Sequence, residues 1–309
     1  MSRPDRRRRL RAAVAFAIVA LGALGAACST RDDSRHADSY RPLLWKVDDG
    51  DNSVYLLGSF HLLKPSDYPL PAATDAAFED AELVVFELSP DDLSSPALAQ
   101  AMAGAALRGD RRTLQQALPA ATWKKLKAHL QSRRIDPVAM QQYDAWFVSL
   151  LIAITEMQTA GLATDHGLDR HFAERTVAAG KPARGLETID AQIALFEGMT
   201  QEQQVQSLQS TLDEVADMRA AIDEMHRLWR AGDEAGLFAA TGAEMKAGFP
   251  ALYARMNRDR NQAWLPDLRA LLDDSTSDDA LVIVGAMHLL GEDGVVEGLR
   301  AAGYRVERL

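Results

Sequence analysis

Two histidines follow aliphatic segments in the same way near opposite ends of the chain. The segments 54–61 (VYLLGSFH) and 281–288 (LVIVGAMH) each end in Gly-x-x-His, at His61 and His288, and two leucines follow each histidine. Neutral imidazoles bind Zn, Mn, Co or Fe ions and carry protons near neutral pH. Either histidine alone could simply cap a strand or bond a carbonyl group. The repetition of the whole unit favours a shared chemical role.

The elements that would position these histidines are buried strands. Four consecutive apolar residues before each glycine suit a strand that is covered on both faces. The glycine permits a turn or a close backbone approach, and the histidine would then project over the carboxyl edge of the sheet, where ligands of open α/β folds bind. A third apolar segment, Leu83–Leu88, places the carboxylate of Glu87 near its end. If these strands are neighbours, both imidazoles and Glu87 meet in one cleft.

The pattern of apolar residues predicts strands near both ends of the chain and helices between them. We expect strands at 43–47, 53–57, 83–88, 183–186, 281–284 and 304–309, the first two forming a hairpin. We expect helices at 72–81, 93–107, 113–132, 136–160, 201–232, 233–246, 249–272 and 291–302. The predicted fold class is α/β (α+β), with a mixed central β-sheet formed by the N- and C-terminal segments and a large helical insertion at about 91–272.

The N-terminus has the pattern of an export signal. Residues 2–11 are basic and residues 12–27 are apolar and uncharged, which is shorter than the roughly 20 residues of a permanent membrane span. Cys28, the only cysteine, follows small residues in a way that resembles the lipobox of bacterial lipoproteins. We expect residues 1–27 to be a removed signal peptide and Cys28 to be lipidated. Ser29 then predicts an outer-membrane anchor on the periplasmic side.

Composition excludes some functions of the exported part. Removing the six arginines and one aspartate of residues 1–27 leaves 28 basic and 43 acidic residues, a net charge of −15. Such a surface repels phosphate backbones, so nucleic acid is not an expected partner. No second cysteine exists for a disulfide or a zinc–thiolate site. We divide this part into a flexible tether at 28–41 and a single domain at 42–309.

From about Leu43 to Leu309 the chain resembles the TraB/GumN family, which includes the Tiki proteases and is related to haem-binding ChaN-like and erythromycin-esterase-like proteins. The paired Gly-x-x-His units match motifs of that family. Further matches are Phe86-Glu87-Leu88, Gly167-Leu168-Asp169, Gly180-Lys181-Pro182, Gly185-Leu186-Glu187-Thr188 with Gln192, and Arg260-Asn261.

The resemblance implies a divalent-metal hydrolase, most simply a peptidase. His61 and His288 would be on or near a Mn, Co, Fe or Zn ion, and Glu87 would be a ligand or the general base for a metal-bound water. Glu187 and Arg260 would orient the metal ligands or hold a developing oxyanion. The residues alone leave simpler roles open. Glu87 could cap the turn after its strand, Glu187 could cap the helix that starts near Asp190, and Arg260 could pair with a surface carboxylate on its helix.

Other polar residues are weaker candidates. Asp165, His166, Asp169 and His171 form a local cluster, but histidines five apart do not share one helix face, so Asp165 is expected to cap a helix and Asp169 to pack or orient. His129 and His226 lie in polar helical stretches and are expected to be solvated. Ser59 has no G-x-S-x-G elbow around it.

Three functions remain at this stage. The first is a metal-dependent hydrolase of the cell envelope with a peptide or protein substrate. The second is a lipoprotein that binds a metal or haem without turnover. The third is a catalytically silent interaction protein of the envelope.

Overall fold

The computed structural model describes residues 40–273 and 278–309. The predicted signal peptide 1–27, Cys28 and nearly all of the tether 28–41 lie outside the described residues. Within the described ranges, no helix is both long and apolar enough to cross a membrane.

A six-stranded mixed sheet has the order β4-β3-β5-β2-β1-β6. The four strands from β4 to β2 run parallel, whereas β1 pairs antiparallel with both β2 and β6. The predicted mixed sheet and its N-terminal hairpin are therefore confirmed. The strands are β1 (Leu44–Asp48), β2 (Ser53–Ser59), β3 (Leu83–Phe86), β4 (Ala183–Gly185), β5 (Ala280–Gly285) and β6 (Arg305–Arg308).

The helices are shorter and more broken than predicted, and proline explains two of the breaks. A helix was predicted over 93–107, but α3 ends at Ser94 and α4 begins at Pro96, with the Ser95 hydroxyl capping the new helix. Pro119 similarly separates α5 from α6. A proline lacks the N–H that a helix interior needs, and it disfavours helical backbone in the residue before it.

Most of the helices lie between β3 and β5 in the chain. Their bounds are α2 (Ala72–Asp80), α3 (Pro90–Ser94), α4 (Pro96–Ala105), α5 (Leu114–Ala117), α6 (Ala120–Ser132), α7 (Ala145–Thr159), α8 (Leu168–Ala179), α9 (Ile189–Glu197), α10 (Gln201–Glu214), α11 (Met218–Ala231), α12 (Glu234–Ala240), α13 (Gly242–Gly248), α14 (Pro250–Tyr253), α15 (Asp259–Asp273), α16 (Ala286–Leu289) and α17 (Val295–Ala301). A π-helix, Ala254–Arg258, joins α14 to α15.

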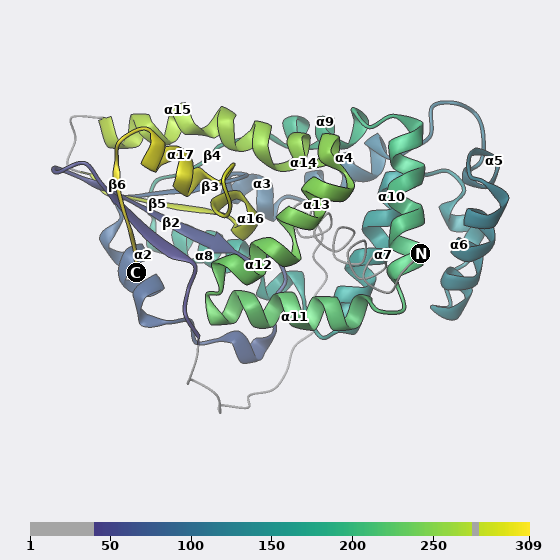
Figure 1. Ribbon diagram of the computed structural model, residues 1–309, viewed down its shortest axis with the longest axis horizontal. Coiled ribbons are helices and arrows are strands. Elements are labelled where there is room, and N and C mark those ends of the chain that lie inside the picture. Colours follow the sequence, from purple (N-terminus) through teal and green to yellow (C-terminus); the bar gives the residue numbers. More distant parts are fainter. Residues whose placement is uncertain (1–39, 274–277) are drawn as a thin grey trace.

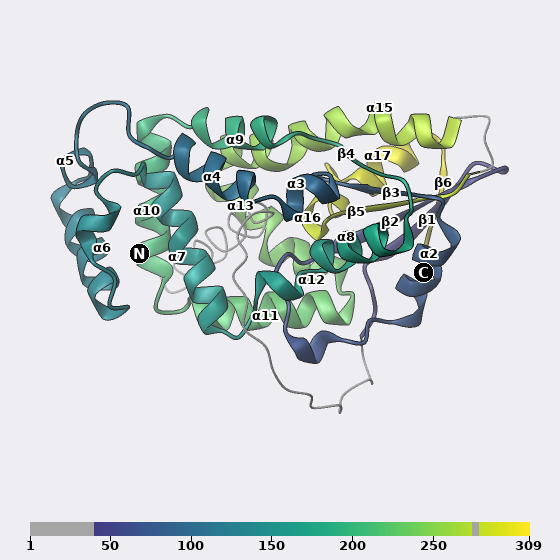
Figure 2. The ribbon, with the colours of Figure 1, turned by 180° about the vertical axis from the view of Figure 1, so that it is seen from behind.

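The molecule is elongated, with the sheet at one end and a helical region at the other (Figure 1). Helices α15 and α17 cover one face of the sheet, and α2 and α8 cover the other. Helices α5, α6, α7 and α10 form the far end, which Figure 2 shows from behind. The carboxyl ends of the parallel strands point toward this helical region, so residues that follow the strands lie between the two parts.

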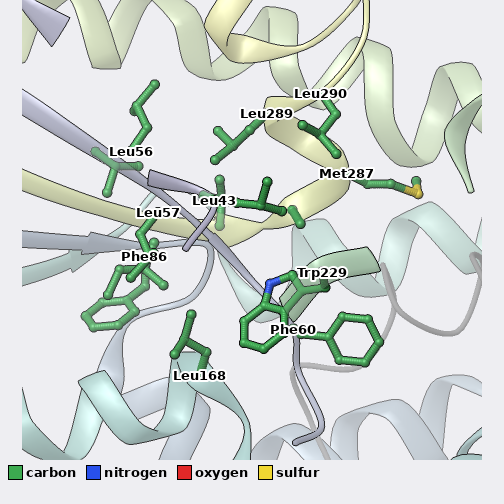
Figure 3. Packing of buried hydrophobic residues seen from close by; sticks show 14 of the residues in the cluster. Leu43, Leu56, Leu57, Phe60, Phe86, Leu168, Trp229, Met287, Leu289 and Leu290 are labelled. Atoms are coloured by element: carbon green, nitrogen blue, oxygen red, sulfur yellow. The ribbon is translucent and has the colours of Figure 1, made fainter. Parts of the chain in front are cut away.

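The central strands are buried because both faces of the sheet are covered. Every residue of β2 and β5 is buried, and Leu56, Phe86 and Leu289 belong to the apolar cluster that surrounds these strands (Figure 3). A second apolar cluster joins α6, α7 and α10 at the far end. Rigid packing on both sides of the strand ends holds the polar groups there in place.

Candidate active site

The carboxyl ends of four parallel strands bring the candidate residues together. Gly285, at the end of β5, pairs with Ser59 at the end of β2, so both Gly-x-x-His turns leave the same edge of the sheet. Glu87 follows β3 on the other side of β5, and Glu187 follows β4. The N- and C-terminal strands of the described residues therefore lie side by side, as the repeated motif predicts.

Gly285 is the point at which these groups come closest. A Cβ atom on Gly285 would lie 3.2 Å from Glu87 Oε1, 3.3 Å from His61 Nε2 and 3.6 Å from His288 Cδ2. Its N–H also donates a 2.8 Å hydrogen bond to Glu87 Oε1. A side chain at this position would require Glu87 and His61 to shift by a few tenths of an ångström.

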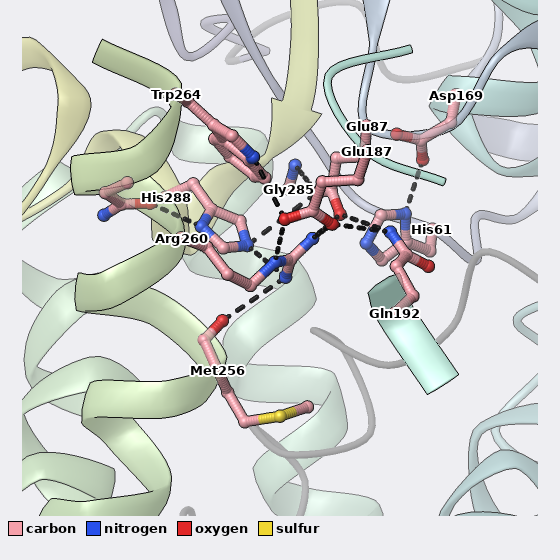
Figure 4. A network of polar contacts seen from close by, with 11 residues as sticks. His61, Glu87, Asp169, Glu187, Gln192, Met256, Arg260, Trp264, Gly285 and His288 are labelled. Atoms are coloured by element: carbon pink, nitrogen blue, oxygen red, sulfur yellow. Dashed lines mark hydrogen bonds and ion pairs between the residues drawn. The ribbon is translucent and has the colours of Figure 1, made fainter. Parts of the chain in front are cut away.

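His61 has one bonded and one free ring nitrogen. Its Nδ1 lies 2.6 Å from Asp169 Oδ2, and because a carboxylate accepts but does not donate, Nδ1 carries the proton. Its Nε2 is buried and has no hydrogen-bond partner. Burial lowers the pKa of His61, but the carboxylates of Asp169 and Glu87 outweigh it and raise that pKa to about 9. His61 is therefore an imidazolium at neutral pH, and its Nε2 is the available proton donor. Figure 4 shows the contact between His61 and Asp169.

Asp169 reaches His61 because the start of α8 packs against the backbone of the first histidine turn. A Cβ on Gly167 would lie 2.2 Å from the carbonyl oxygen of His61, and the N–H of Leu168 donates to the carbonyl of Phe60 at 3.2 Å. The prediction of an orienting role for Asp169 matches this geometry. The alternative metal cluster around it does not form: among the described residues, no three histidine, cysteine or acidic side chains are grouped to hold a metal ion.

The turn that carries His61 is also held from the side of α11. Trp229 Nε1 donates to the carbonyl of Gly58 at 2.9 Å, and His226 Nε2 lies 2.8 Å from Asp67 Oδ2. The expectation that His226 is solvated is wrong: only 8% of the residue is exposed, because its helix packs against the loop after β2. The side chain of His129 is likewise 8% exposed, and it faces Glu156.

Glu87 is a buried carboxylate with strong partners. Its Oε1 accepts the N–H of Gly285, and its Oε2 accepts Arg260 Nη2 at 2.7 Å and, more weakly, Gln192 Nε2 at 3.4 Å. Burial raises the pKa of Glu87, but the charges of Arg260, His288 and His61 lower it to about 2. Glu87 does not cap the next helix, whose first turn is capped by Ser89.

Arg260 lies at the centre of the site, and all five of its N–H groups have acceptors. Nε and Nη2 bind the two oxygens of Glu187 at 2.8 and 2.7 Å, and Nη2 also binds Glu87. Nη1 lies 3.0 Å from His288 Nε2 and donates to the carbonyl of Met256 at 3.3 Å. Arg260 is 5% exposed, so its alternative as a surface ion pair is wrong.

The same contacts decide the role of Glu187. Besides Arg260, it accepts the indole N–H of Trp264 at 3.0 Å, and Gln192 Nε2 lies 3.3 Å from its second oxygen. The alternative in which Glu187 caps α9 is wrong, because the hydroxyl of Thr188 performs that function. Glu187 instead anchors the guanidinium of Arg260 by a bidentate contact.

His288 has no free nitrogen. Its Nδ1 is 2.6 Å from Asn261 Oδ1, and its Nε2 accepts Arg260 Nη1. Its ring lies 4.5 Å from that of Trp264, and the residue is wholly buried. Burial and the charge of Arg260 lower the pKa of His288 to about 3, so this imidazole is neutral.

Sequence reasoning did not assign roles to two of these partners. Asn261 was named only as part of the Arg260-Asn261 motif, and Trp264 was not singled out. Trp264 lies four residues after Arg260, hence on the same face of α15, and that spacing was the available signal. The backbone contact from Met256 comes from the π-helix, which no sequence pattern indicated; such distortions are frequent at functional sites.

His61 and Glu87 line one small cavity. It has a volume of about 10 Å³, enough for roughly one water molecule. Its lining residues are His61, Phe86, Glu87, Leu88, Leu93, Asp169 and Gln192. His61, Glu87, Asp169 and Gln192 therefore form the polar part of the cavity wall, and Phe86, Leu88 and Leu93 form its apolar part.

The three predicted metal ligands do not fit a metal ion as a set. His288 has one lone pair at Nε2, and Arg260 takes it; Arg260 also takes one oxygen of Glu87. Of their donor atoms only His61 Nε2 has no partner, because Glu87 Oε1 accepts the N–H of Gly285. A guanidinium beside them also repels a second cation.

The family model of the TraB/PrgY/gumN family matches residues 43–308, and the chain belongs to this family. The chain is 24% identical to the protein YbaP of Escherichia coli (strain K12) over 252 residues, which are 81% of this chain and 89% of YbaP. It is also 22% identical over 303 residues to the protein named Metalloprotease TIKI2 of Danio rerio, covering 82% of this chain and 58% of that protein. No solved structure matches the chain.

Proposed function

We propose that this protein is a hydrolase that cleaves peptide bonds, with His61 and Glu87 as its reacting pair. One observation carries the proposal: His61 Nε2 is buried without a hydrogen-bond partner, and His61 and Glu87 both line one water-sized cavity. A buried donor without an acceptor costs stability, and such groups occur where a ligand or a reacting atom completes the site. The similarity to a protein named a metalloprotease supports hydrolysis as the reaction class.

The ionisation states assign the roles. A water molecule in the cavity attacks the carbonyl carbon while its proton passes to Glu87, and the N–H at His61 Nε2 faces the developing oxyanion. His61 then gives its own Nε2 proton to the leaving amine nitrogen as the carbon–nitrogen bond breaks. Glu87 returns the proton to His61. Because Arg260 keeps Glu87 weakly basic, removal of the proton from water is the demanding step.

Arg260, Glu187 and His288 act as a support in this proposal. The guanidinium has no N–H left for a substrate oxygen, so the oxyanion role predicted for Arg260 passes to His61. Its bidentate contact with Glu187 and its contacts with Glu87 and His288 hold the reacting carboxylate in one orientation. Preorganised groups of this kind lower the barrier because they do not need to reorient during the reaction.

The metal dependence that the sequence predicts is the form of this proposal that the geometry supports least. No step above needs a metal ion, and Arg260 holds two of the three predicted ligands. Capture of metal or haem without turnover meets the same obstacle, since His61 Nε2 is the one open imidazole nitrogen of the pair.

The test is hydrolysis of a fluorogenic peptide library by the purified protein. We expect His61→Gln and Glu87→Gln to lose at least about 100-fold in kcat/KM, the range for a lost acid or base. His166→Ala is the matched control, because this histidine interacts with the fold through its carbonyl, which accepts the hydroxyl of Tyr68. Equal rates in wild type, His61→Gln and Glu87→Gln would refute the proposal.

We also propose that the protein acts at the periplasmic side of the outer membrane, anchored through Cys28. The basic and apolar character of residues 2–27 and the small residues before Cys28 support this location. Metabolic labelling with a fatty acid is the test: the wild-type protein takes up label, and Cys28→Ser does not. Labelling of both or of neither would contradict lipidation at Cys28.

A further inference from the structure

The guanidinium of Arg260 lies where a metal ion bound by the strand-end residues would have to be. It contacts both oxygens of Glu187, one oxygen of Glu87 and the only lone pair of His288 Nε2. A metal ion binds imidazole nitrogen and carboxylate oxygen at about 2.0–2.2 Å. Since Nη1 lies 3.0 Å from His288 Nε2 along the same lone pair, an ion there would overlap the guanidinium.

The two carboxylates that face Arg260 need a positive charge between them. Glu87 is 7% exposed and Glu187 is partly buried, and both carboxylates contact the guanidinium of Arg260. Buried carboxylates without a counter-charge are costly, so this pair needs a positive group at this point. Arg260 supplies it, and its chain is fixed by α15 and the π-helix on which Met256 accepts Nη1.

We propose that Arg260 is the resident cation of this site: it takes the position of a divalent metal ion between Glu87, Glu187 and His288, and it excludes such an ion. Removal of the guanidinium alone leaves two carboxylates and one neutral imidazole converging on its place. That donor set suits Mn, Co, Fe or Zn. The inference goes beyond the hydrolase proposal, because it holds whatever the substrate is.

Cobalt(II) binding tests the inference directly. We measure Co²⁺ affinity by calorimetry and by visible absorption for wild type, Arg260→Ala, Arg260→Lys and the double variant Arg260→Ala/His288→Ala. We expect Arg260→Ala to bind one Co²⁺ at least about 100-fold more tightly than wild type. Arg260→Lys keeps the charge and should bind as weakly as wild type, and the double variant should lose the gained site.

The variant Arg260→Ala leaves two buried carboxylates unpaired, so its folding is followed as well. We expect Co²⁺ to raise its thermal midpoint while that of wild type stays unchanged, because an ion that binds only the folded state stabilises it. If the variant is insoluble, Co²⁺ in the growth medium should restore soluble protein. Failure of Co²⁺ to bind, stabilise or rescue Arg260→Ala would overturn the inference.

Stoichiometric binding of Co²⁺ to wild type that His288→Ala abolishes would also overturn the inference.

The hydrolase proposal is tested by a separate measurement, peptide hydrolysis by the wild-type protein. Wild-type peptide hydrolysis that persists in a chelator agrees with both proposals. Absence of hydrolysis refutes the proposed function and leaves the cobalt measurements unaffected.

Discussion

The two Gly-x-x-His units share one layout in the chain, yet their histidines occupy different environments. His61 pairs with a carboxylate, keeps one nitrogen free and lines a cavity, whereas His288 has both nitrogens bonded and lies under Trp264. The partners come from distant helices, α8 for His61 and α15 for His288. A repeated motif therefore places two side chains at one sheet edge, but the packing around each determines its chemistry.

Matched substitutions by glutamine should separate the two histidines most strongly. We expect His61→Gln to lower kcat/KM by about 10²–10⁴-fold, and to cost about 1–3 kcal/mol of unfolding free energy because Asp169 loses its buried charged partner. His288→Gln should instead cost about 2–4 kcal/mol, because it leaves Arg260 and Asn261 with unpaired buried groups. Peptide hydrolysis measures the loss of kcat/KM in each variant, and urea denaturation measures the loss of unfolding free energy. A stable His288→Gln protein with no activity would reverse the assignment.

The pH dependence of the two histidines should differ in sign. The pKa of His61 is raised to about 9, so its stabilisation is complete below its unfolded value near 6.5 and is lost as pH rises through 9. The pKa of His288 is lowered to about 3, so its contribution is complete above about 6.5 and falls as pH decreases toward 3. Proton-detected NMR titration of the ring C–H signals measures both values.

The variant Asp169→Asn sharpens that titration. It removes the carboxylate that raises the pKa of His61, so we expect the His61 pKa to fall while that of His288 stays near 3. Each ring C–H signal is assigned by its absence from the spectrum of His61→Gln or His288→Gln. If both histidines titrate near 6.5 in the wild-type protein, the proposed difference between their environments is wrong.

The two motif glycines should show a smaller difference of the same kind. A Cβ on Gly285 would press on Glu87 and His61, so Gly285→Ala should lower kcat by about 10-fold or more. A Cβ on Gly58 would meet Leu43 Cβ at 3.0 Å and Ala286 Cα at 3.2 Å, so Gly58→Ala should cost about 1–3 kcal/mol through overpacking. Measurements of kcat and of the thermal unfolding midpoint for both variants test this prediction. Equal effects of the two variants on kcat would contradict this prediction.

The main strands and the meeting of the chain ends could be predicted from the sequence. Runs such as Leu281–Val284 are apolar without interruption, and only a strand covered on both faces suits them. Helix breaks were less predictable, because apolar spacing continues across Pro96 and Pro119 although the backbone cannot. The role of His226 was missed because a polar helical stretch gives no sign that a loop with a buried aspartate will pack on it.

The amino-acid sequence by itself determined which groups gather at the sheet edge: the periodicity and the glycines place His61, Glu87, Glu187 and His288 after four parallel strands. Only the tertiary structure decided which of them is free to react. That outcome depends on the single guanidinium of Arg260, whose helix lies far along the chain from β2 and β3. Its five N–H groups satisfy two carboxylates, one imidazole and one backbone carbonyl, and they leave His61 Nε2 open. Such a distribution of hydrogen bonds is set by distances and directions in space, which spacing along a chain does not specify.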